Sequence, residues 1–377
     1  VWEHPLLILA GAALLPSRPL VPVLERFDAR GQRLARLVLV AVAAGLGVLL
    51  TQAIDARDDA MVLVFTVAIS FVGILALGAR WAFVAILLLL MLARGGHDTL
   101  ETSLQGDRSR SYFGVYTVED VPADRSRQLL HGTTLHGKQS QEPGLRREPT
   151  TYYGRTSGVG LVLQGAPFIY GNQARVGIVG LGVGTLACYR QPGQRWTFFE
   201  IDPNVLAYSR AGRFTFLSRC APDAAVRLGD ARLKLADEPS NSFDVLAIDA
   251  FSSDAIPLHL MTREAFDTYA RALSADGIAV VHISNRYIDL RPVLAAHAQE
   301  RGWVTLMRDD PAAIDGRTTS SLWVAMARNP ESLARVLQAS PDTGWRELGE
   351  PAPQVWTDDH ASILPFLVWS NVLGRGV

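Results

Sequence analysis

Residues 175–202 read RVGIVGLGVGTLACYRQPGQRWTFFEID, and this stretch decides the fold. A short β-branched run enters a turn that carries Gly180, Gly182 and Gly184, a helix-like segment follows, and a second apolar run ends at Glu200. Glycines at a strand-to-helix turn let the backbone approach a ligand closely, and an acidic residue about 20 positions further on can accept hydrogen bonds from a ribose diol. The stretch therefore predicts a nucleoside-binding site.

Strand-like and helix-like runs continue to alternate along the chain. Strands are expected at 175–180, 196–201, 225–228, 243–249, 277–283, 303–308 and 321–327. Helices are expected at 184–190, 203–211, 263–273, 289–301 and 331–338. Repeated βα units predict an α/β fold with a mostly parallel, doubly wound sheet, which binds ligands at the carboxyl ends of its strands.

The spacing of the glycines indicates which class of nucleoside ligand the turn fits. A dinucleotide site prefers Gly-x-Gly-x-x-Gly, whereas Gly180, Gly182 and Gly184 follow Gly-x-Gly-x-Gly. This pattern fits S-adenosyl nucleosides better, because they have no pyrophosphate to seat at the helix N-terminus. Three nearby glycines also fit a structural turn, but Glu200 and Asp202 at the end of the next strand favour the nucleoside.

Further acids follow the later strands. After the third strand, Asp230 can accept a hydrogen bond from an adenine amino group, with the backbone of Ala231 against the ring, or it can cap a helix. Asp249 lies at the tip of the fourth strand, and Asp254 lies in the loop that follows. Two carboxylates suit an amine substrate, because one accepts the ammonium proton and the other anchors a distal cation. Asp254 also fits a helix cap or a solvated loop, and the acids at 356–360 fit either a pocket closure or a surface turn.

Residues 108–170 are expected to form a small β-strand module, with hairpin strands at 112–119 and 128–135. Gln139 and Tyr153 are candidates for lining the cofactor or acceptor pocket, and paired strand residues without such a role are the alternative.

The histidines and cysteines do not form a recognisable metal pattern. His136, His282 and His360 are assigned structural roles, and no metal is expected. Cys188 and Cys220 lack metal-type spacing, so neither a zinc site nor a disulfide framework is indicated.

The first part of the chain is apolar enough to enter a membrane. Residues 34–54 are long enough to span a bilayer, and 60–93 are apolar except for Arg80. The second segment is interpreted as two short spans that turn at 78–80, and 5–15 as the end of another span. Because few charges interrupt these segments, spans are favoured over a buried bundle of a soluble protein. The chain starts without Met, so residues 1–95 are expected to be the C-terminal part of a longer membrane region, ahead of the module at 108–170 and a catalytic domain at 171–377.

The orientation of these spans has two interpretations. Five arginines between residues 18 and 36, against three acids between 55 and 59, place the first loop in the cytoplasm. Three further crossings would then leave the C-terminal region outside, in conflict with an intracellular cofactor. A re-entrant short span removes the conflict, and we expect a multi-pass protein of the bacterial inner membrane with a cytoplasmic catalytic domain.

In the order of its motifs the chain resembles the spermidine synthase (polyamine aminopropyltransferase) family, in particular the bacterial branch that fuses a multi-span membrane region ahead of the synthase-like domain. The resemblance covers about residues 108–330 and rests on the motifs at 180–185, 200–203, 229–231 and 249–257. It implies a Rossmann-like, class I methyltransferase-type sheet in which Glu200 binds ribose, Asp230 adenine and Asp249 the reacting amine.

The resemblance also implies the reactants. Decarboxylated S-adenosylmethionine is the implied co-substrate, and putrescine or another small amine is the implied acceptor. Membrane lipid and a second copy of the chain, in a homodimer, are further expected partners. The near-balance of 36 Lys+Arg against 37 Asp+Glu gives no electrostatic case for nucleic acid.

Three departures from the family pattern leave alternatives open. Val183 stands where the family usually has Asp, and 153–155 read Tyr-Gly-Arg instead of Tyr-His-Glu. Asp249 and Asp254 stand five positions apart, where the family has three. A methyltransferase that uses intact S-adenosylmethionine, or a non-catalytic membrane protein that binds polyamine or nucleoside, are the alternative functions. The first needs a partner for the methionine carboxylate, and the sequence supplies no obvious one.

Overall fold

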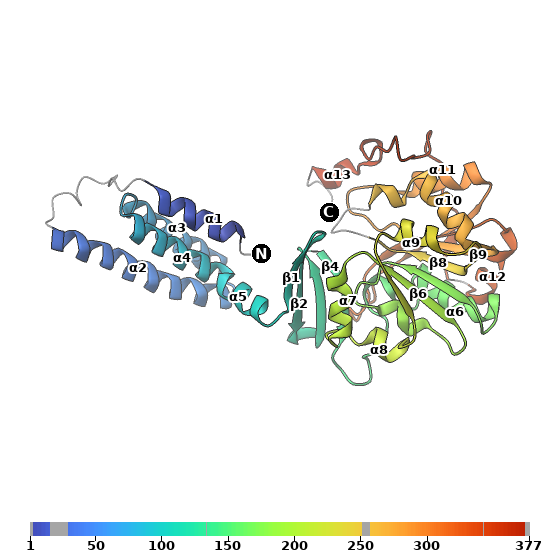
Figure 1. Ribbon diagram of the computed structural model, residues 1–377, viewed down its shortest axis with the longest axis horizontal. Coiled ribbons are helices and arrows are strands. Elements are labelled where there is room, and N and C mark those ends of the chain that lie inside the picture. The colour runs from blue at the N-terminus through green and yellow to red at the C-terminus, as the bar shows by residue number, and fades with distance from the viewer. Residues whose placement is uncertain (1–2, 16–28, 133, 251–256, 342, 374–377) are drawn as a thin grey trace. The chain divides into compact units, whose positions relative to one another are not determined.

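The computed structural model describes residues 3–15, 29–132, 134–250, 257–341 and 343–373. The chain forms two compact units, Val1–Ser109 and Arg110–Val377, which are described separately (Figure 1).

The first unit is helical. Its helices are α1 (Glu3–Leu14), α2 (Ala29–Asp55), α3 (Asp59–Leu75), α4 (Arg80–Met91), a π-helical turn at Leu92–Gly96, and α5 (His97–Leu104). The chain reverses between α3 and α4 at Gly78, whose φ of +91° suits glycine, so the expected turn at 78–80 is present. Two helices, Ala29–Asp55 and Arg80–Leu104, are long and apolar enough to cross a membrane, a test that a soluble core helix also passes. Only 22% and 11% of their apolar windows are buried, which is less than a core helix requires.

The second unit contains a small sheet and a large one. The small sheet runs in the order β1 (Arg108–Ser111), β2 (Gly114–Val121), β3 (Ser126–His131) and β4 (Thr134–Ser140). The expected hairpin corresponds to β2 and β3, which pair antiparallel. The predicted strand at 128–135 was too long, because β3 ends at His131 and β4 begins at Thr134.

The large sheet has the order β12-β10-β11-β9-β8-β5-β6-β7. Its strands are β5 (Arg175–Val179), β6 (Arg195–Glu200), β7 (Ala225–Leu228), β8 (Phe243–Ile248), β9 (Leu273–His282), β10 (Val304–Asp310), β11 (Ser321–Ala327) and β12 (Trp345–Arg346). β7, β6, β5, β8 and β9 pair in parallel, whereas β11, β10 and β12 continue the sheet antiparallel. The α/β fold class is confirmed, with an antiparallel edge added to the expected parallel part.

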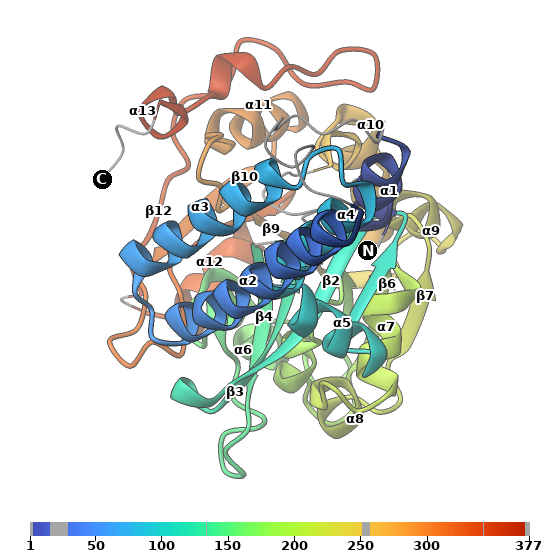
Figure 2. The same cartoon turned by 90° about the vertical axis from the view of Figure 1, so that its left-hand side faces the viewer.

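The strand order reverses between β5 and β8. From β5 the chain proceeds to β6 and β7 on one side, and then returns to β8 and β9 on the other. Such a switch point leaves a crevice at the carboxyl ends of the central strands, where ligands bind in open α/β sheets. β7 and β12, at the two edges of the sheet, lie on opposite sides of this unit in Figure 2.

Helices cover both faces of the large sheet. They are α6 (Gly158–Tyr170), α7 (Pro203–Arg210), α8 (Phe216–Cys220), α9 (Ala231–Asp237), α10 (Arg263–Ala272), α11 (Arg291–Arg301), α12 (Pro330–Ala339) and α13 (Trp369–Val372). Successive residues of a strand point to opposite faces, so Phe198 packs in the core beneath α6 and α12, and Phe199 in the core beneath α9, α10 and α11. α6 was not predicted and lies within the segment expected to be a β-strand module.

Cys188 and Cys220 form a disulfide, although no disulfide framework was indicated by the sequence. Cys188 lies in the 3₁₀ helix Thr185–Tyr189 that follows the glycine turn, and Cys220 ends α8. The residues are 32 positions apart, and their Cα atoms are brought to 4.8 Å by the packing of α8 on this helix. Spacing along the sequence could not indicate that contact.

Candidate active site

The glycine turn lies directly after β5 and next to the end of β8. Gly180, Gly182 and Gly184 all have positive φ, at 94°, 52° and 86°. A Cβ atom on Gly180 would lie 2.1 Å from the carbonyl oxygen of Asp249, so only glycine allows the two strand ends to approach this closely. The turn therefore determines where Asp249 lies.

A cavity of about 240 Å³ opens beside this turn. Its wall combines aromatic side chains of the small sheet and of the segment after it with three acids from the ends of β6, β7 and β8. The lining residues are Phe113, Tyr116, Leu129, His136, Tyr152, Tyr153, Val179, Gly180, Gly182, Phe199, Glu200, Ile201, Val205, Asp230, Ala231, Asp249, Ala250, Pro257, His259 and Leu260. The structure thus brings together most of the site residues expected from the sequence.

Glu200 is held by backbone groups on both sides. Its carboxylate accepts one hydrogen bond from the N–H of Leu181 at 2.9 Å and another from the N–H of Asp202 at 2.8 Å. The side chain is 6% exposed, and burial raises its pKa above the ordinary value. A carboxylate has about four lone-pair sites, so Glu200 keeps capacity to accept from a ligand hydroxyl group.

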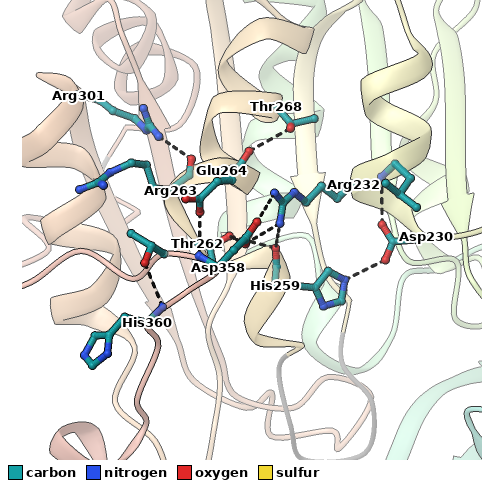
Figure 3. A network of polar contacts seen from close by, with 12 residues as sticks. Asp230, Arg232, His259, Thr262, Arg263, Glu264, Thr268, Arg301, Asp358 and His360 are labelled. Carbon is teal, nitrogen blue, oxygen red and sulfur yellow. Dashed lines mark hydrogen bonds and ion pairs between the residues drawn. The ribbon is translucent and has the colours of Figure 1, made fainter.

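Asp230 has the helix-capping role that its sequence position allowed, and its second carboxylate oxygen has a histidine partner. One carboxylate oxygen caps α9 by accepting the N–H of Leu233 at 3.0 Å, and the other lies 2.9 Å from Nε2 of His259 (Figure 3). Asp230, Ala231 and His259 all line the cavity. Asp230 can therefore meet an adenine amino group at this end of the cavity while keeping its cap.

A network beside Asp230 ties the start of α9 to the C-terminal segment (Figure 3). Arg232 pairs with both carboxylate oxygens of Asp358, at 2.7 and 2.6 Å, and the hydroxyl of Thr262 donates to Asp358 at 2.7 Å. The Arg232 guanidinium lowers the pKa of Asp358 to about 2. The acids at 358 and 359 are not among the described lining residues, so this segment supports the start of α9 from outside the cavity.

Asp249 follows β8 and is 9% exposed. The hydroxyl of Tyr153 donates to one of its carboxylate oxygens, and Nδ1 of His282 lies 2.7 Å from the other. Burial raises the pKa of Tyr153 well above its ordinary value, so this hydroxyl stays protonated and donates. Asp254, the second predicted catalytic acid, lies outside the described residues.

The turn that carries Tyr152 and Tyr153 is conformationally strained. Thr151 precedes them with φ of +55°, which is unusual for a β-branched residue. Its backbone N–H donates to Arg317 at 3.0 Å, and its carbonyl accepts from Thr319 at 3.1 Å. Strain of this kind persists where the surroundings enforce it, often at functional sites, and here it presents both tyrosines to the cavity.

Gln139 and Gly184 were predicted to bind the cofactor but do not line the cavity. The side chain of Gln139 is buried and bonds to the backbone and hydroxyl of Thr215 and to the carbonyl of Arg146. A Cβ atom on Gly184 would lie at ordinary contact distances of 3.5 to 3.7 Å from Phe216 and Leu217 of α8, so the positive φ of +86° is what favours glycine at this position.

Val183 lies buried inside the glycine turn, facing the small sheet. A Cβ atom on Gly137 of β4 would lie 2.7 Å from its side chain, so the valine fills the space between turn and sheet. The position at which the resemblance expects a carboxylate is therefore a packing position here.

The sequence interpretation missed His136, Tyr152 and His259, which line the cavity, and His282, which contacts Asp249 from behind the lining. His282 ends β9, the strand next to β8, and the carboxyl ends of neighbouring parallel strands meet at one edge of a sheet. The pairing of neighbouring strands was the available signal, because strands ending at 249 and 283 were both predicted, and β9 ends one residue earlier, at His282. Among the described residues, no group of three or more His, Cys, Asp or Glu could hold a metal.

Comparisons with known proteins define the class to which this fold and site are similar. No family model matches the chain. A stretch of 113 residues is 33% identical to the polyamine aminopropyltransferase of Vibrio vulnificus, covering 29% of this chain and 37% of that protein. The chain thus spans little more than a third of this curated relative.

A solved structure extends the similarity beyond that stretch. The crystal structure of a probable spermidine synthase from Corynebacterium glutamicum superposes with a TM-score of 0.51 at 18% identity, covering 68% of this chain and 98% of that one. At this identity the likeness shows the fold. The chain is therefore similar to a polyamine aminopropyltransferase over 113 residues, and its fold is that of a spermidine synthase-like protein.

Proposed function

We propose that the chain is a membrane-anchored aminopropyltransferase, which transfers an aminopropyl group from decarboxylated S-adenosylmethionine to an amine such as putrescine. The observation that carries the proposal is the meeting of three acids, Glu200, Asp230 and Asp249, in one cavity at the switch point of the sheet. Their order along the strands matches a ribose, an adenine and an amine. The local identity to a polyamine aminopropyltransferase supports the same assignment.

The chemistry follows from this placement. Glu200 would accept the ribose hydroxyls, and Asp230 the adenine amino group, which leaves the aminopropyl arm near Asp249. The acceptor amine attacks the methylene carbon beside the sulfonium, the N–C bond forms, the C–S bond breaks, and methylthioadenosine leaves. Asp249 takes the proton from the attacking amine, so that a lone pair is available for the displacement. Alignment of the two reactants in a closed cavity supplies much of the remaining rate enhancement.

The charge of the cavity favours the decarboxylated nucleoside. None of the described lining residues is Lys or Arg, whereas three are acids. The carboxylate of intact S-adenosylmethionine would meet no cationic side chain among them, and burying an unpaired charge is unfavourable. A methyltransferase is therefore the weaker alternative. A non-catalytic binding protein is the second candidate function. It is supported by the buried Val183, which stands where the family has a carboxylate.

The first unit is proposed to anchor the enzyme in the bacterial inner membrane through Ala29–Asp55 and Arg80–Leu104. Two considerations bear on which side of the membrane the catalytic unit faces. An intracellular nucleoside requires the cytoplasm, whereas the Cys188–Cys220 disulfide is typical of an oxidising compartment. Fusions of a phosphatase and of a fluorescent reporter to the C-terminus decide between them. Contact with lipid and a homodimer remain predictions.

The test of the function is product analysis with the full chain in detergent micelles. Decarboxylated S-adenosylmethionine is incubated with a panel of diamines, and mass spectrometry follows the products. We expect methylthioadenosine and an aminopropylated amine in equal amounts. Calorimetry with both nucleosides completes the test: preference for the carboxylated form would favour the methyltransferase, and binding without turnover would favour the non-catalytic protein.

A further inference from the structure

The side chain of His282 has a closely packed environment to which the proposed function gives no role. Its side chain is 5% exposed and lies between Tyr152 and Trp323, with ring centroids 4.7 and 4.5 Å away and interplanar angles of 22° and 18°. The indole N–H of Trp323 donates to the carbonyl of Tyr152 at 3.2 Å, which closes the stack. The plane of the imidazole is therefore fixed by an aromatic on each face.

Both ring nitrogens of His282 have partners in that plane. Nδ1 lies 2.7 Å from a carboxylate oxygen of Asp249, and Nε2 lies 2.7 Å from Oγ of Ser284. The N–H of Leu322 donates to the same Oγ, also at 2.7 Å. The chain Asp249–His282–Ser284 thus begins at the cavity and ends at a backbone N–H of β11.

The direction of each hydrogen bond follows from the chemistry of its partners. An ionised carboxylate only accepts, so Nδ1 of His282 carries the proton that faces Asp249. In the neutral ring Nε2 then accepts, and the hydroxyl of Ser284 must donate to it. The Leu322 N–H occupies one lone pair of Oγ and leaves the Ser284 O–H available to donate to Nε2. A neutral His282 between these two partners is therefore the Nδ1–H tautomer.

We propose that His282 is a positioning residue for aminopropyl transfer: fixed as the Nδ1–H tautomer by Ser284, it sets the orientation of the Asp249 carboxylate. The inference rests on the proposed function. Tyr153 holds the second carboxylate oxygen, so the plane of the group is fixed at two points. His282 and Tyr153 occupy two of the about four lone-pair sites of the Asp249 carboxylate. Because these two donors fix the orientation of the carboxylate, they also fix the direction of the remaining lone pairs, which accept the proton of the amine.

Two substitutions separate the hydrogen bond from the stacking. His282→Phe keeps a ring between Tyr152 and Trp323 but removes both nitrogens. His282→Asn loses the ring but can place an amide N–H where Nδ1 stood. We expect kcat to fall by about 10- to 100-fold in His282→Phe, which is the range for a lost hydrogen bond to a charged group. The KM for the nucleoside should stay unchanged, and His282→Asn should recover part of kcat.

An exposed histidine supplies the control. His360→Phe makes the same replacement at an exposed position outside the described cavity lining and should leave kcat unchanged. Unchanged kcat in His282→Phe, with the wild type forming product, would overturn the positioning role. An equal loss in His282→Phe and His282→Asn, with nucleoside binding weakened in parallel, would also overturn it, because that pattern marks a structural residue.

A readout that does not depend on turnover distinguishes this inference from the proposed function. The full chain, with ring-¹⁵N histidine, contains eight histidines, and the signal of His282 is identified by its absence in His282→Phe. We expect Nδ1 protonated and Nε2 unprotonated at neutral pH, and loss of that preference in Ser284→Ala. An Nε2–H tautomer in the wild type would refute the inference, whether or not any amine is a substrate.

Discussion

The substitution Glu200→Gln removes the charge of the carboxylate that we expect to hold the ribose, and keeps the size of the side chain. In the native site the N–H groups of Leu181 and Asp202 occupy one lone pair on each oxygen, at 2.9 and 2.8 Å. We expect the ribose hydroxyls to use the lone-pair capacity that remains on the carboxylate. A glutamine offers only one oxygen, and its amide nitrogen must face one of the two backbone N–H groups.

The magnitude follows from these contacts. A hydrogen bond to a charged acceptor is worth about 1.5 to 3 kcal/mol, so losing one ribose contact weakens nucleoside binding by roughly 10- to 150-fold. The unpaired backbone N–H lowers the free energy of unfolding by about 1 to 3 kcal/mol. Relief of desolvation offsets part of that loss, because burial already disfavours the charged form of Glu200 and raises its pKa.

The assay is calorimetric titration of the full chain with methylthioadenosine, the product of the proposed reaction. Circular dichroism checks that the variant is folded. Glu331→Gln, an exposed glutamate in the first turn of α12, is the matched control and should bind as the wild type does. A folded Glu200→Gln protein whose Kd lies within about threefold of the wild type would refute the assignment of Glu200 to the ribose, since one lost charge-assisted contact exceeds that change.

Three further predictions concern other parts of the catalytic unit. Asp249→Asn should slow product formation by about 10²- to 10⁴-fold, as for loss of a general base, while calorimetry shows nearly native nucleoside binding; an equal loss of binding would contradict the catalytic role. Burial lowers the pKa of His297 to about 4, so between pH 6.5 and 4 the unfolded chain binds a proton that the folded one does not. The free energy of unfolding should therefore fall by about 3 kcal/mol across that window, as urea titrations at several pH values would show, and His297→Gln should flatten the dependence. Opening the Cys188–Cys220 disulfide, which closes a loop over 32 positions, should lower the free energy of unfolding by about 3 to 4 kcal/mol in a reductant. A Cys188→Ala, Cys220→Ala double variant should be insensitive to the reductant; no stability difference between oxidised and reduced wild type would contradict this.

The parallel half of the large sheet could be predicted from the sequence because its signals are local. A buried parallel strand is a short run of apolar residues, and the turn after it carries glycines or an acid within a few positions. β5, β6, β7 and β8 were therefore predicted to within about two residues, the usual uncertainty of such boundaries. Glu200, Asp230 and Asp249 stand at strand tips, so topology alone brings them to one edge.

Helix α6 was missed because its sequence carries little helical signal. Four of its positions are Gly or Pro, which are poor helix formers, and most of its residues are buried, so no polar face marks the helical period. The sequence also did not decide that β10 and β11 pair antiparallel, because the direction of a strand depends on the segment that connects it to the preceding strand. Tertiary packing decided both.

The sequence by itself determined an α/β sheet, a nucleoside-type turn and the acids at its strand ends, because each depends on residues close together in the chain. Only the tertiary structure showed that His282 and Tyr153 bond to Asp249 and that Cys188 pairs with Cys220. It also showed that Gln139 bonds to Thr215 and does not line the cavity. These outcomes depend on contacts between residues tens of positions apart, and side-chain orientation at such contacts is set by the packing of whole elements.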